Sequence, residues 1–157
     1  MSGPRFRIEP AGAADLAQIR GNLERFWFGA PPVALHHPMF VCEFGDTAYV
    51  ARKDDGEIIG YLFGFVTPGR VGYVHLVAVR DDSRGQGVGR GLYEAFISAA
   101  RARGAVKLKA IANPANDATA SLHRRLGFDG ARIDDYGGGG AARIVFQRDL
   151  EDPARAT

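Results

Sequence analysis

One short stretch combines alternating glycines with two arginines. Residues 84–91 read Arg-Gly-Gln-Gly-Val-Gly-Arg-Gly, with arginines at 84 and 90, and they follow Arg80-Asp81-Asp82-Ser83. The stretch follows an apolar run and precedes a segment with helical spacing, so it predicts a strand-to-helix turn. The N-terminus of a helix offers unpaired N–H groups and the positive end of the helix dipole, and glycines let a ligand approach the backbone. The turn therefore predicts an anion site that suits a pyrophosphate.

The common nucleotide motifs do not fit this turn. A dinucleotide fingerprint requires glycine at position 90 or 92, where the chain has Arg90 and Leu92. A P-loop requires Gly-Lys followed by Ser or Thr, and this sequence is absent. A flexible turn would explain one or two glycines but not the alternation beside two arginines.

The elements that position this turn follow from periodicity. Alternating or apolar runs predict strands at 6–10, 48–53, 58–66, 72–79, 106–112, 128–134 and 142–149. Helical spacing predicts helices at 13–28, 87–103 and 116–126, and prolines at 31, 32 and 38 indicate a broken stretch over 29–44 with one short helix. Residues 137–140, all glycine, predict a flexible connection. The order indicates an α/β fold with an antiparallel start and crossover helices later.

Bulk composition narrows the class of protein. A chain of 157 residues is expected to form a single domain over 1–157. Net charge is +2 without a block of like charge, which disfavours nucleic acid, and no long apolar run predicts a membrane span. One cysteine, Cys42, excludes an internal disulfide, and no metal site is expected. We expect a cytoplasmic protein with a small partner molecule.

Two motifs together resemble a known family. Arg84-x-x-Gly87-x-Gly89 after a Val-Ala-Val strand looks like the coenzyme A signature of the GNAT superfamily of N-acetyltransferases. The segment from Asn116 to Phe128 is similar to its second signature, an asparagine, a small-residue helix, an aromatic or histidine, and Gly-Phe. The resemblance implies the GNAT acyl-CoA N-acyltransferase fold, with a mixed, mostly antiparallel sheet of six to seven strands and about four helices.

The resemblance also implies a coenzyme site. In this family the central strand splays from its neighbour, and the pantetheine arm of acetyl-CoA pairs with the free backbone. The residues expected to bind acetyl-CoA, a co-substrate, are Val77, Ala78, Val79, Arg84, Gly85, Gln86, Gly87, Val88, Gly89, Arg90 and Asn116. Asn116 has a second explanation, because asparagine is a favoured helix N-cap.

Two histidines occupy the places where relatives carry catalytic residues. His123 takes the position of a tyrosine that protonates the coenzyme A thiolate, and is the expected general acid; a surface histidine near a helix C-terminus is the alternative. His75 lies about where relatives place a glutamate base. A neutral imidazole could accept the proton of the amine, while a buried, hydrogen-bonded histidine is the rival interpretation. Tyr73, Glu43 and Glu94 are weaker candidates for the base.

The acceptor is expected to be an amine of a small molecule or peptide. Family members usually line this pocket with the first helices and their loop, here Phe26, Trp27, Phe28, His36, His37, Met39 and Phe40. Aromatic residues favour an acceptor with an apolar part, although they would also fit a core or a homodimer contact, and homodimers are common among relatives. Two alternatives stay open: a non-catalytic acetyl-CoA binder, and an acyltransferase with a different acyl donor.

Overall fold

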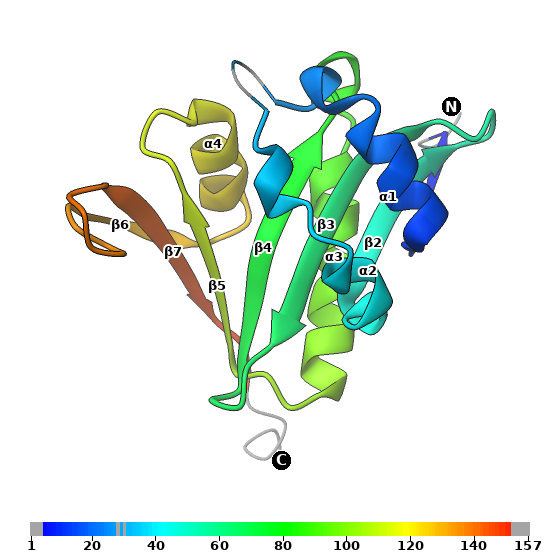
Figure 1. Ribbon diagram of the computed structural model, residues 1–157. Coiled ribbons are helices and arrows are strands. Elements are labelled where there is room, and N and C mark those ends of the chain that lie inside the picture. The colour runs from blue at the N-terminus through cyan, green and yellow to red at the C-terminus, as the bar shows by residue number, and fades with distance from the viewer. Residues whose placement is uncertain (1–4, 28, 30, 152–157) are drawn as a thin grey trace.

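A seven-stranded sheet forms the centre of the protein in the computed structural model, which describes residues 5–27, 29 and 31–151 (Figure 1). The strand order is β1-β2-β3-β4-β5-β7-β6. The strands are β1 (Phe6–Pro10), β2 (Ala48–Lys53), β3 (Ile58–Val66), β4 (Val71–Val79), β5 (Lys107–Ala112), β6 (Asp129–Ile133) and β7 (Arg143–Asp149). The α-helices are α1 (Ala13–Arg20), α2 (Met39–Cys42), α3 (Val88–Ala102) and α4 (Asp117–Arg125).

The predicted fold class is confirmed. Every neighbouring strand pair is antiparallel except β4 and β5, which are parallel and are joined through α3. A parallel pair needs a crossover connection, and α3 provides it. β2 and β3 form an antiparallel hairpin whose turn contains Asp55 and Gly56, a pair that is typical of such turns.

The first helix is shorter than the sequence predicts. The prediction of one helix over 13–28 is wrong, because α1 ends at Arg20. Gly21 is the C-cap, and the Asn22 side chain donates a hydrogen bond to the Gln18 carbonyl, which ends the helix. A 3-10 turn over Leu23–Arg25 follows. The periodicity misled because residues 23 and 26 are both buried although the helix does not continue.

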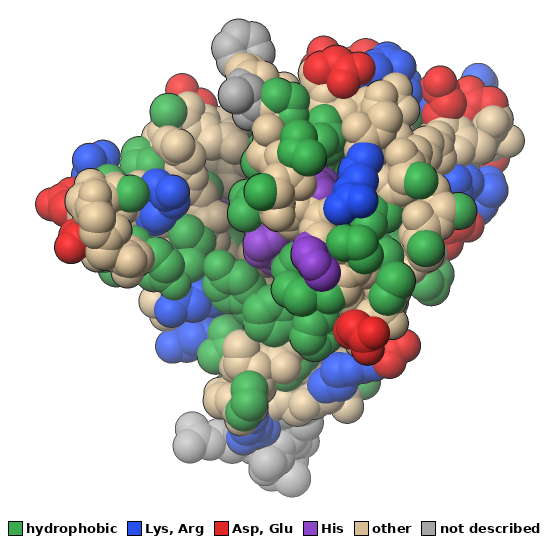
Figure 2. All heavy atoms as spheres, viewed as in Figure 1, with side chains coloured by type: hydrophobic (Ala, Val, Ile, Leu, Met, Phe, Trp, Pro, Cys, Tyr) green, Lys and Arg blue, Asp and Glu red, His purple; other side chains and the backbone are tan. Residues whose placement is uncertain are grey.

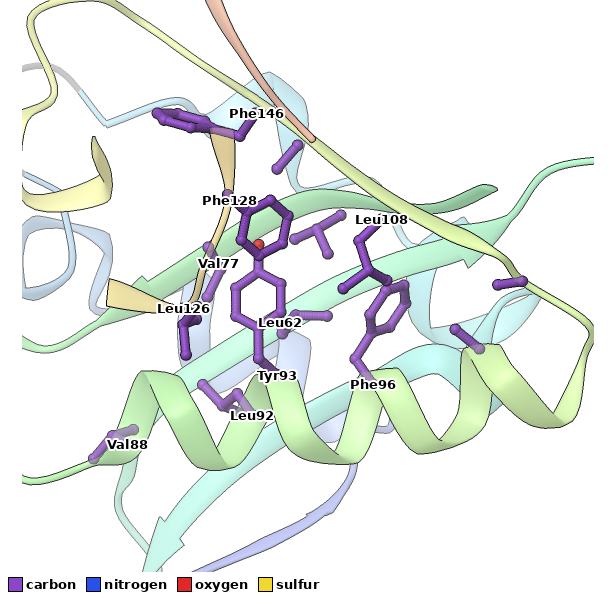
Figure 3. Close-up of a cluster of buried hydrophobic side chains, with 14 of the residues drawn as sticks. Leu62, Val77, Val88, Leu92, Tyr93, Phe96, Leu108, Leu126, Phe128 and Phe146 are labelled. Atoms are coloured by element: carbon purple, nitrogen blue, oxygen red, sulfur yellow. The ribbon is translucent and has the colours of Figure 1, made fainter. Parts of the chain in front are cut away.

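Two apolar cores lie on the two faces of the sheet. On one face α3 packs across the strands, and Tyr93 and Phe96 point from α3 toward Leu108 and Phe128 (Figure 3). On the other face α1, α2 and the connecting segments cover β2, β3 and β4 (Figure 1). Residues 31–44 contain the 3-10 turn Val33–Leu35 and α2, which confirms the expected broken stretch with a short helix.

Candidate active site

The strands β4 and β5 separate halfway along β4. Their pairing ends at Val74 and Ala110, whereas β4 stays paired with β3 as far as Val79 (Figure 1). From residue 75 to 79, the backbone groups that face β5 therefore have no strand partner among the described residues. This segment contains Val77, Ala78 and Val79, the residues expected to pair with a pantetheine arm. An unpaired strand edge can accept an extended ligand as an additional strand.

A β-bulge at His75 accompanies this separation. Phe63 pairs with Leu76 and Gly64 pairs with Val74, so His75 is an extra residue on β4. A bulge interrupts the ladder, bends its strand and redirects a side chain. Gly64 permits the close approach, since a Cβ there would lie 2.6 Å from the Tyr73 carbonyl oxygen. The bulge thus places an imidazole where the strands begin to diverge.

The contacts of His75 define which ring nitrogen is free. Its Nε2 lies 2.9 Å from the Leu35 carbonyl oxygen, and its ring stacks on Phe40 at a centroid distance of 4.2 Å. A carbonyl oxygen only accepts, so Nε2 carries the hydrogen and Nδ1 holds a lone pair. Among the described residues Nδ1 has no hydrogen-bond partner. Burial lowers the pKa of His75, against a smaller opposing effect of the Leu35 carbonyl. His75 is therefore a neutral imidazole with an available lone pair near pH 7.

The turn before α3 presents a run of unpaired amides. No backbone N–H group from Arg84 to Arg90 has an acceptor among the described residues. Gly85 and Gly87 have φ values of 77° and 82°, and Gly87 is the N-cap of α3. These angles lie in the left-handed region that favours glycine. Consecutive free amides at a helix N-terminus form an anion site.

The two other glycines of this turn have a different explanation. We expected Gly89 and Gly91 to let a ligand approach, but both lie against protein side chains. A Cβ on Gly89 would be 2.9 Å from Leu122 Cδ1, and one on Gly91 would be 3.4 Å from Ile8. Gly89 thus allows α4 to pack closely on α3. Arg84 is exposed and its Nε lies 3.4 Å from the Val79 carbonyl oxygen, beside the free edge of β4.

His123 lies in the core on the α3 side of the sheet. Its Nδ1 is 2.7 Å from the Thr119 carbonyl oxygen, and its Nε2 is 2.5 Å from the Tyr93 hydroxyl. Nδ1 therefore donates to Thr119, and Nε2 accepts from Tyr93. The ring is 1% exposed and stacks on Phe146, and burial lowers its pKa. The alternative of a surface histidine is wrong.

These contacts bear on the expected role of His123. Both ring nitrogens are engaged within the protein, and His75 stacks on Phe40 in the opposite core, so the structure does not bring the two histidines into one cluster. The arrangement favours a positioning role in which His123 fastens α4 to α3. The general-acid role stays a prediction.

Asn116 caps α4. Its Oδ1 accepts a hydrogen bond from the Thr119 N–H at 3.1 Å, which confirms the N-cap interpretation. A contact between Asn116 and the coenzyme remains a prediction.

The expected acceptor residues divide into two groups. Phe26, His36 and Phe40 are buried, whereas His37 and Met39 are exposed. Phe28 lies outside the described residues. Exposed apolar side chains gather on the same segment, namely Val33, Leu35, Met39 and Phe44. In Figure 2, histidine side chains lie in the middle of this face among hydrophobic ones.

A hydrogen-bond chain in the interior fixes residues 32–36. The sequence did not predict this chain. Trp27 Nε1 donates to the Tyr61 hydroxyl, which donates to His36 Nε2, each over 2.7 Å. His36 Nδ1 then donates to the Pro32 carbonyl at 2.8 Å. Every polar atom of this chain is satisfied, and burial lowers the pKa of His36. His36 thus serves to hold residues 32–36 on β3.

The other candidates for the base lie in different surroundings. Glu43 and Glu94 are exposed, and Glu94 is on the outer face of α3. Tyr73 is half-buried beside Phe65, and burial raises its pKa, with a further contribution from Tyr136 in the β6–β7 connection. His75 is therefore the candidate with a free lone pair at the strand divergence.

The described residues contain no group of three or more His, Cys, Asp or Glu side chains arranged to hold a metal ion. None of the helices in this part of the chain combines the length and apolarity needed to cross a membrane.

Comparisons with known proteins agree with this geometry. The model of the acetyltransferase (GNAT) family matches residues 16–128. An L-methionine sulfoximine/L-methionine sulfone acetyltransferase of Pseudomonas paraeruginosa is 37% identical over 136 residues, covering 78% of this chain and 79% of that protein. The N-alpha-acetyltransferase RimI of Mycobacterium tuberculosis is 33% identical over 112 residues, covering 68% of each.

The solved structures agree on the fold. A chain of the NatC complex, solved with Gag peptide and CoA, superposes with a TM-score of 0.77 at 18% identity, over 94% of this chain and 99% of that one. The free amides and both sequence signatures lie within the residues that the family model matches. The chain therefore belongs to the GNAT family and is an acetyl-CoA-dependent N-acetyltransferase.

Proposed function

We propose that this enzyme acetylates the primary amine of a small molecule with an apolar part, with His75 as the base. The observation that carries the proposal is the free Nδ1 lone pair of His75. Leu35 holds its Nε2–H, which leaves the Nδ1 lone pair unused at the point where β4 leaves β5.

The coenzyme would bind along one continuous surface. The free amides from residue 84 to 90 would hold the pyrophosphate, and the unpaired edge of β4 over Val77, Ala78 and Val79 would pair with the pantetheine arm. A backbone N–H on this edge would then face the thioester carbonyl. Such a fixed dipole stabilises the oxyanion that forms when the amine attacks.

The amine must lose a proton for the reaction to proceed. Alkyl amines have pKa values near 10, so they are mostly protonated at neutral pH. His75 Nδ1 would accept the proton directly or through one water molecule. The neutral amine nitrogen attacks the acetyl carbonyl, the C–S bond breaks, and the second proton of the nitrogen passes to the departing thiolate, directly or through water, to give the N-acetyl amide and the free thiol of coenzyme A.

The surface beside His75 favours a small acceptor with an apolar part. The exposed Val33, Leu35 and Met39 supply apolar contacts. Within residues 31–44, Glu43 is the single acidic residue of the sequence. A polycationic acceptor would require several carboxylates. The relative named for methionine sulfoximine and methionine sulfone supports an amino-acid analogue of this size. A peptide N-terminus is the second candidate, supported by the likeness to RimI.

An amine panel tests the proposal. Purified protein is supplied with acetyl-CoA and methionine sulfone, methionine sulfoximine, lysine, or an alanine-initiated peptide, and free thiol is measured. We expect thiol release with an amino-acid analogue and little with the peptide. Coenzyme binding without thiol release for any amine would indicate a non-catalytic binder.

A His75→Gln variant tests the base. Loss of a general base lowers kcat by about 10²-fold or more, while the affinity for acetyl-CoA is expected to stay unchanged. His37→Gln is the matched control, because His37 is exposed on the acceptor segment. Equal kcat for both variants would show that His75 is not the base.

A further inference from the structure

A second cleft, which borders the proposed coenzyme site at Arg90, runs along α3. It measures about 370 Å³ and lies between α3, the end of α4 and β7. Its lining residues are Arg90, Tyr93, Glu94, Ile97, Ser98, Arg101, Leu126 and Arg148. Small-molecule sites typically begin at about 300 Å³, so the volume suits a small ligand.

The cleft has an excess of positive charge. Three guanidinium groups face one carboxylate, that of Glu94, which leaves two positive charges without a counter-ion. Within the described chain, Arg90, Arg101 and Arg148 form no ion pair. In contrast, Arg52 and Arg80 each bind two carboxylates. The cleft arginines are thus available to an external anion.

Arg148 is held in place before any ligand binds. Its Nη1 donates to the Leu126 carbonyl oxygen at 3.2 Å, at the C-terminal end of α4. Arg148 lies opposite Leu108 in the β5–β7 ladder, and directly opposed side chains share a face. Leu108 packs in the core under α3, so Arg148 also lies on the α3 side. A guanidinium fixed in this way loses little freedom when it binds a ligand.

The remaining lining residues give the cleft an apolar base and a hydroxyl group. Tyr93, Ile97 and Leu126 provide an apolar base, and Ser98 adds a hydroxyl donor. Arg101 is in the last turn of α3, eleven residues after Arg90. At 1.5 Å per residue this places Arg101 about 16 Å from the coenzyme turn along the helix axis. Arg90 therefore borders both sites, whereas Arg101 lies well away from the glycine-rich turn.

We propose that this cleft binds a small anion with at least two negative charges, of the phosphate type, between Arg101 and Arg148. Guanidinium groups bind phosphate oxygens through paired, charge-assisted hydrogen bonds. The ligand would neutralise the two unbalanced positive charges, and Ser98 would donate a third hydrogen bond.

Inorganic phosphate in a chloride buffer is the probe, followed by amide chemical shifts in nuclear magnetic resonance. We expect saturable shifts at Ser98 and Arg101. Signals of Gly85 and Gly87 report the coenzyme turn separately, so binding there cannot be mistaken for binding in the cleft. Arg101→Gln and Arg148→Gln should each weaken binding about tenfold, as expected for the loss of one charge-assisted hydrogen bond.

Two further variants make the test specific for charge in the cleft. Glu94→Gln removes the opposing carboxylate and should tighten phosphate binding. Arg125→Gln is the control, because Arg125 is an exposed arginine outside the lining, and phosphate binding should not change. Shifts that do not saturate, or equal weakening by Arg125→Gln and Arg101→Gln, would overturn the proposal. Spectra of the free variants report whether each one is folded.

Discussion

At the residue scale, His75 and His123 differ in whether a ring nitrogen is free to accept a proton from the substrate. His75 donates through Nε2 to Leu35 and keeps Nδ1 free, whereas His123 uses both nitrogens within the protein. The chemistry of an imidazole depends on which ring nitrogen carries the hydrogen. A nitrogen that already accepts a hydrogen bond must give up that bond before it can take up a proton from the substrate.

The pH dependence of turnover should reflect the lowered pKa of His75. Burial lowers that pKa below the usual 6.5, so the proposed base is mainly neutral at pH 7 and becomes protonated on the acid side. We expect kcat with saturating substrates to be level from about pH 7 upward and to fall below about pH 6.5. Initial rates of thiol release from pH 5 to 8 measure this profile. A kcat that does not fall on the acid side would rule out His75.

Replacing His123 separates its two roles. His123→Phe leaves the buried Tyr93 hydroxyl without its acceptor, which should cost about 1–3 kcal/mol in free energy of unfolding. A positioning role predicts nearly unchanged turnover at saturating acetyl-CoA, and the double variant with Tyr93→Phe should recover part of the stability. Denaturant unfolding and thiol release measure both. A turnover loss of about 10²-fold in a folded variant would instead establish the acid role.

At the scale of elements, the bulge of β4 depends on one glycine of β3. A Cβ on Gly64 would lie 2.6 Å from the Tyr73 carbonyl oxygen and 2.7 Å from Phe96. Gly64→Ala should therefore destabilise the protein by about 1–3 kcal/mol and displace His75, lowering kcat. Gly45→Ala is the matched control, because a Cβ there meets nothing within 4 Å. Similar unfolding midpoints for the two variants would contradict this account.

A substitution in the turn before α3 should change the affinity for acetyl-CoA. Gly87 has φ 82°, and a left-handed conformation costs an alanine about 1–2 kcal/mol, so Gly87→Ala should shift the free amides. We expect a higher KM for acetyl-CoA with little change in kcat. Gly56→Ala introduces comparable strain at φ 91° in the distant β2–β3 hairpin and should leave this KM unchanged. Equal KM values for the two variants would argue against the pyrophosphate site.

At the scale of the whole molecule, buried histidines couple stability to pH. Burial lowers the pKa of His36, His75 and His123 in the folded state, whereas the unfolded chain has values near 6.5. Well above pH 6.5 the three are neutral in both states, and their contribution to the stability is fully present. As pH falls below 6.5 the unfolded chain binds protons first, so the free energy of unfolding decreases until the folded pKa values are passed.

Urea unfolding between pH 5 and 8 measures this effect. We expect a decrease below pH 6.5 that is smaller in His123→Phe, which has one buried histidine fewer. His37→Gln should keep the full slope, because His37 is exposed. A slope that His123→Phe does not reduce would show that the buried imidazoles are not its source.

Local features were readable from the sequence because their cause lies within a few residues. The strands β1, β2 and β3 have the predicted bounds, and the alternating glycines before α3 predicted a run of free amides that the fold contains. Periodicity and helix-end chemistry require no knowledge of distant contacts. The prediction of a longer first helix was wrong because it followed the spacing of the buried residues 23 and 26, whereas Gly21 and the Asn22 side chain end the helix locally.

The sequence by itself therefore determined the family, the order of elements and the position of the glycine-rich turn before α3. Only the tertiary structure decided the state of each histidine, since the partner of His75 is Leu35, forty residues away, and that of His123 is Tyr93, thirty residues away. The same holds for the arginine cleft along α3, whose side chains come from three elements. Burial and hydrogen-bond partners set the proton position and the pKa of an imidazole, and both arise from long-range packing.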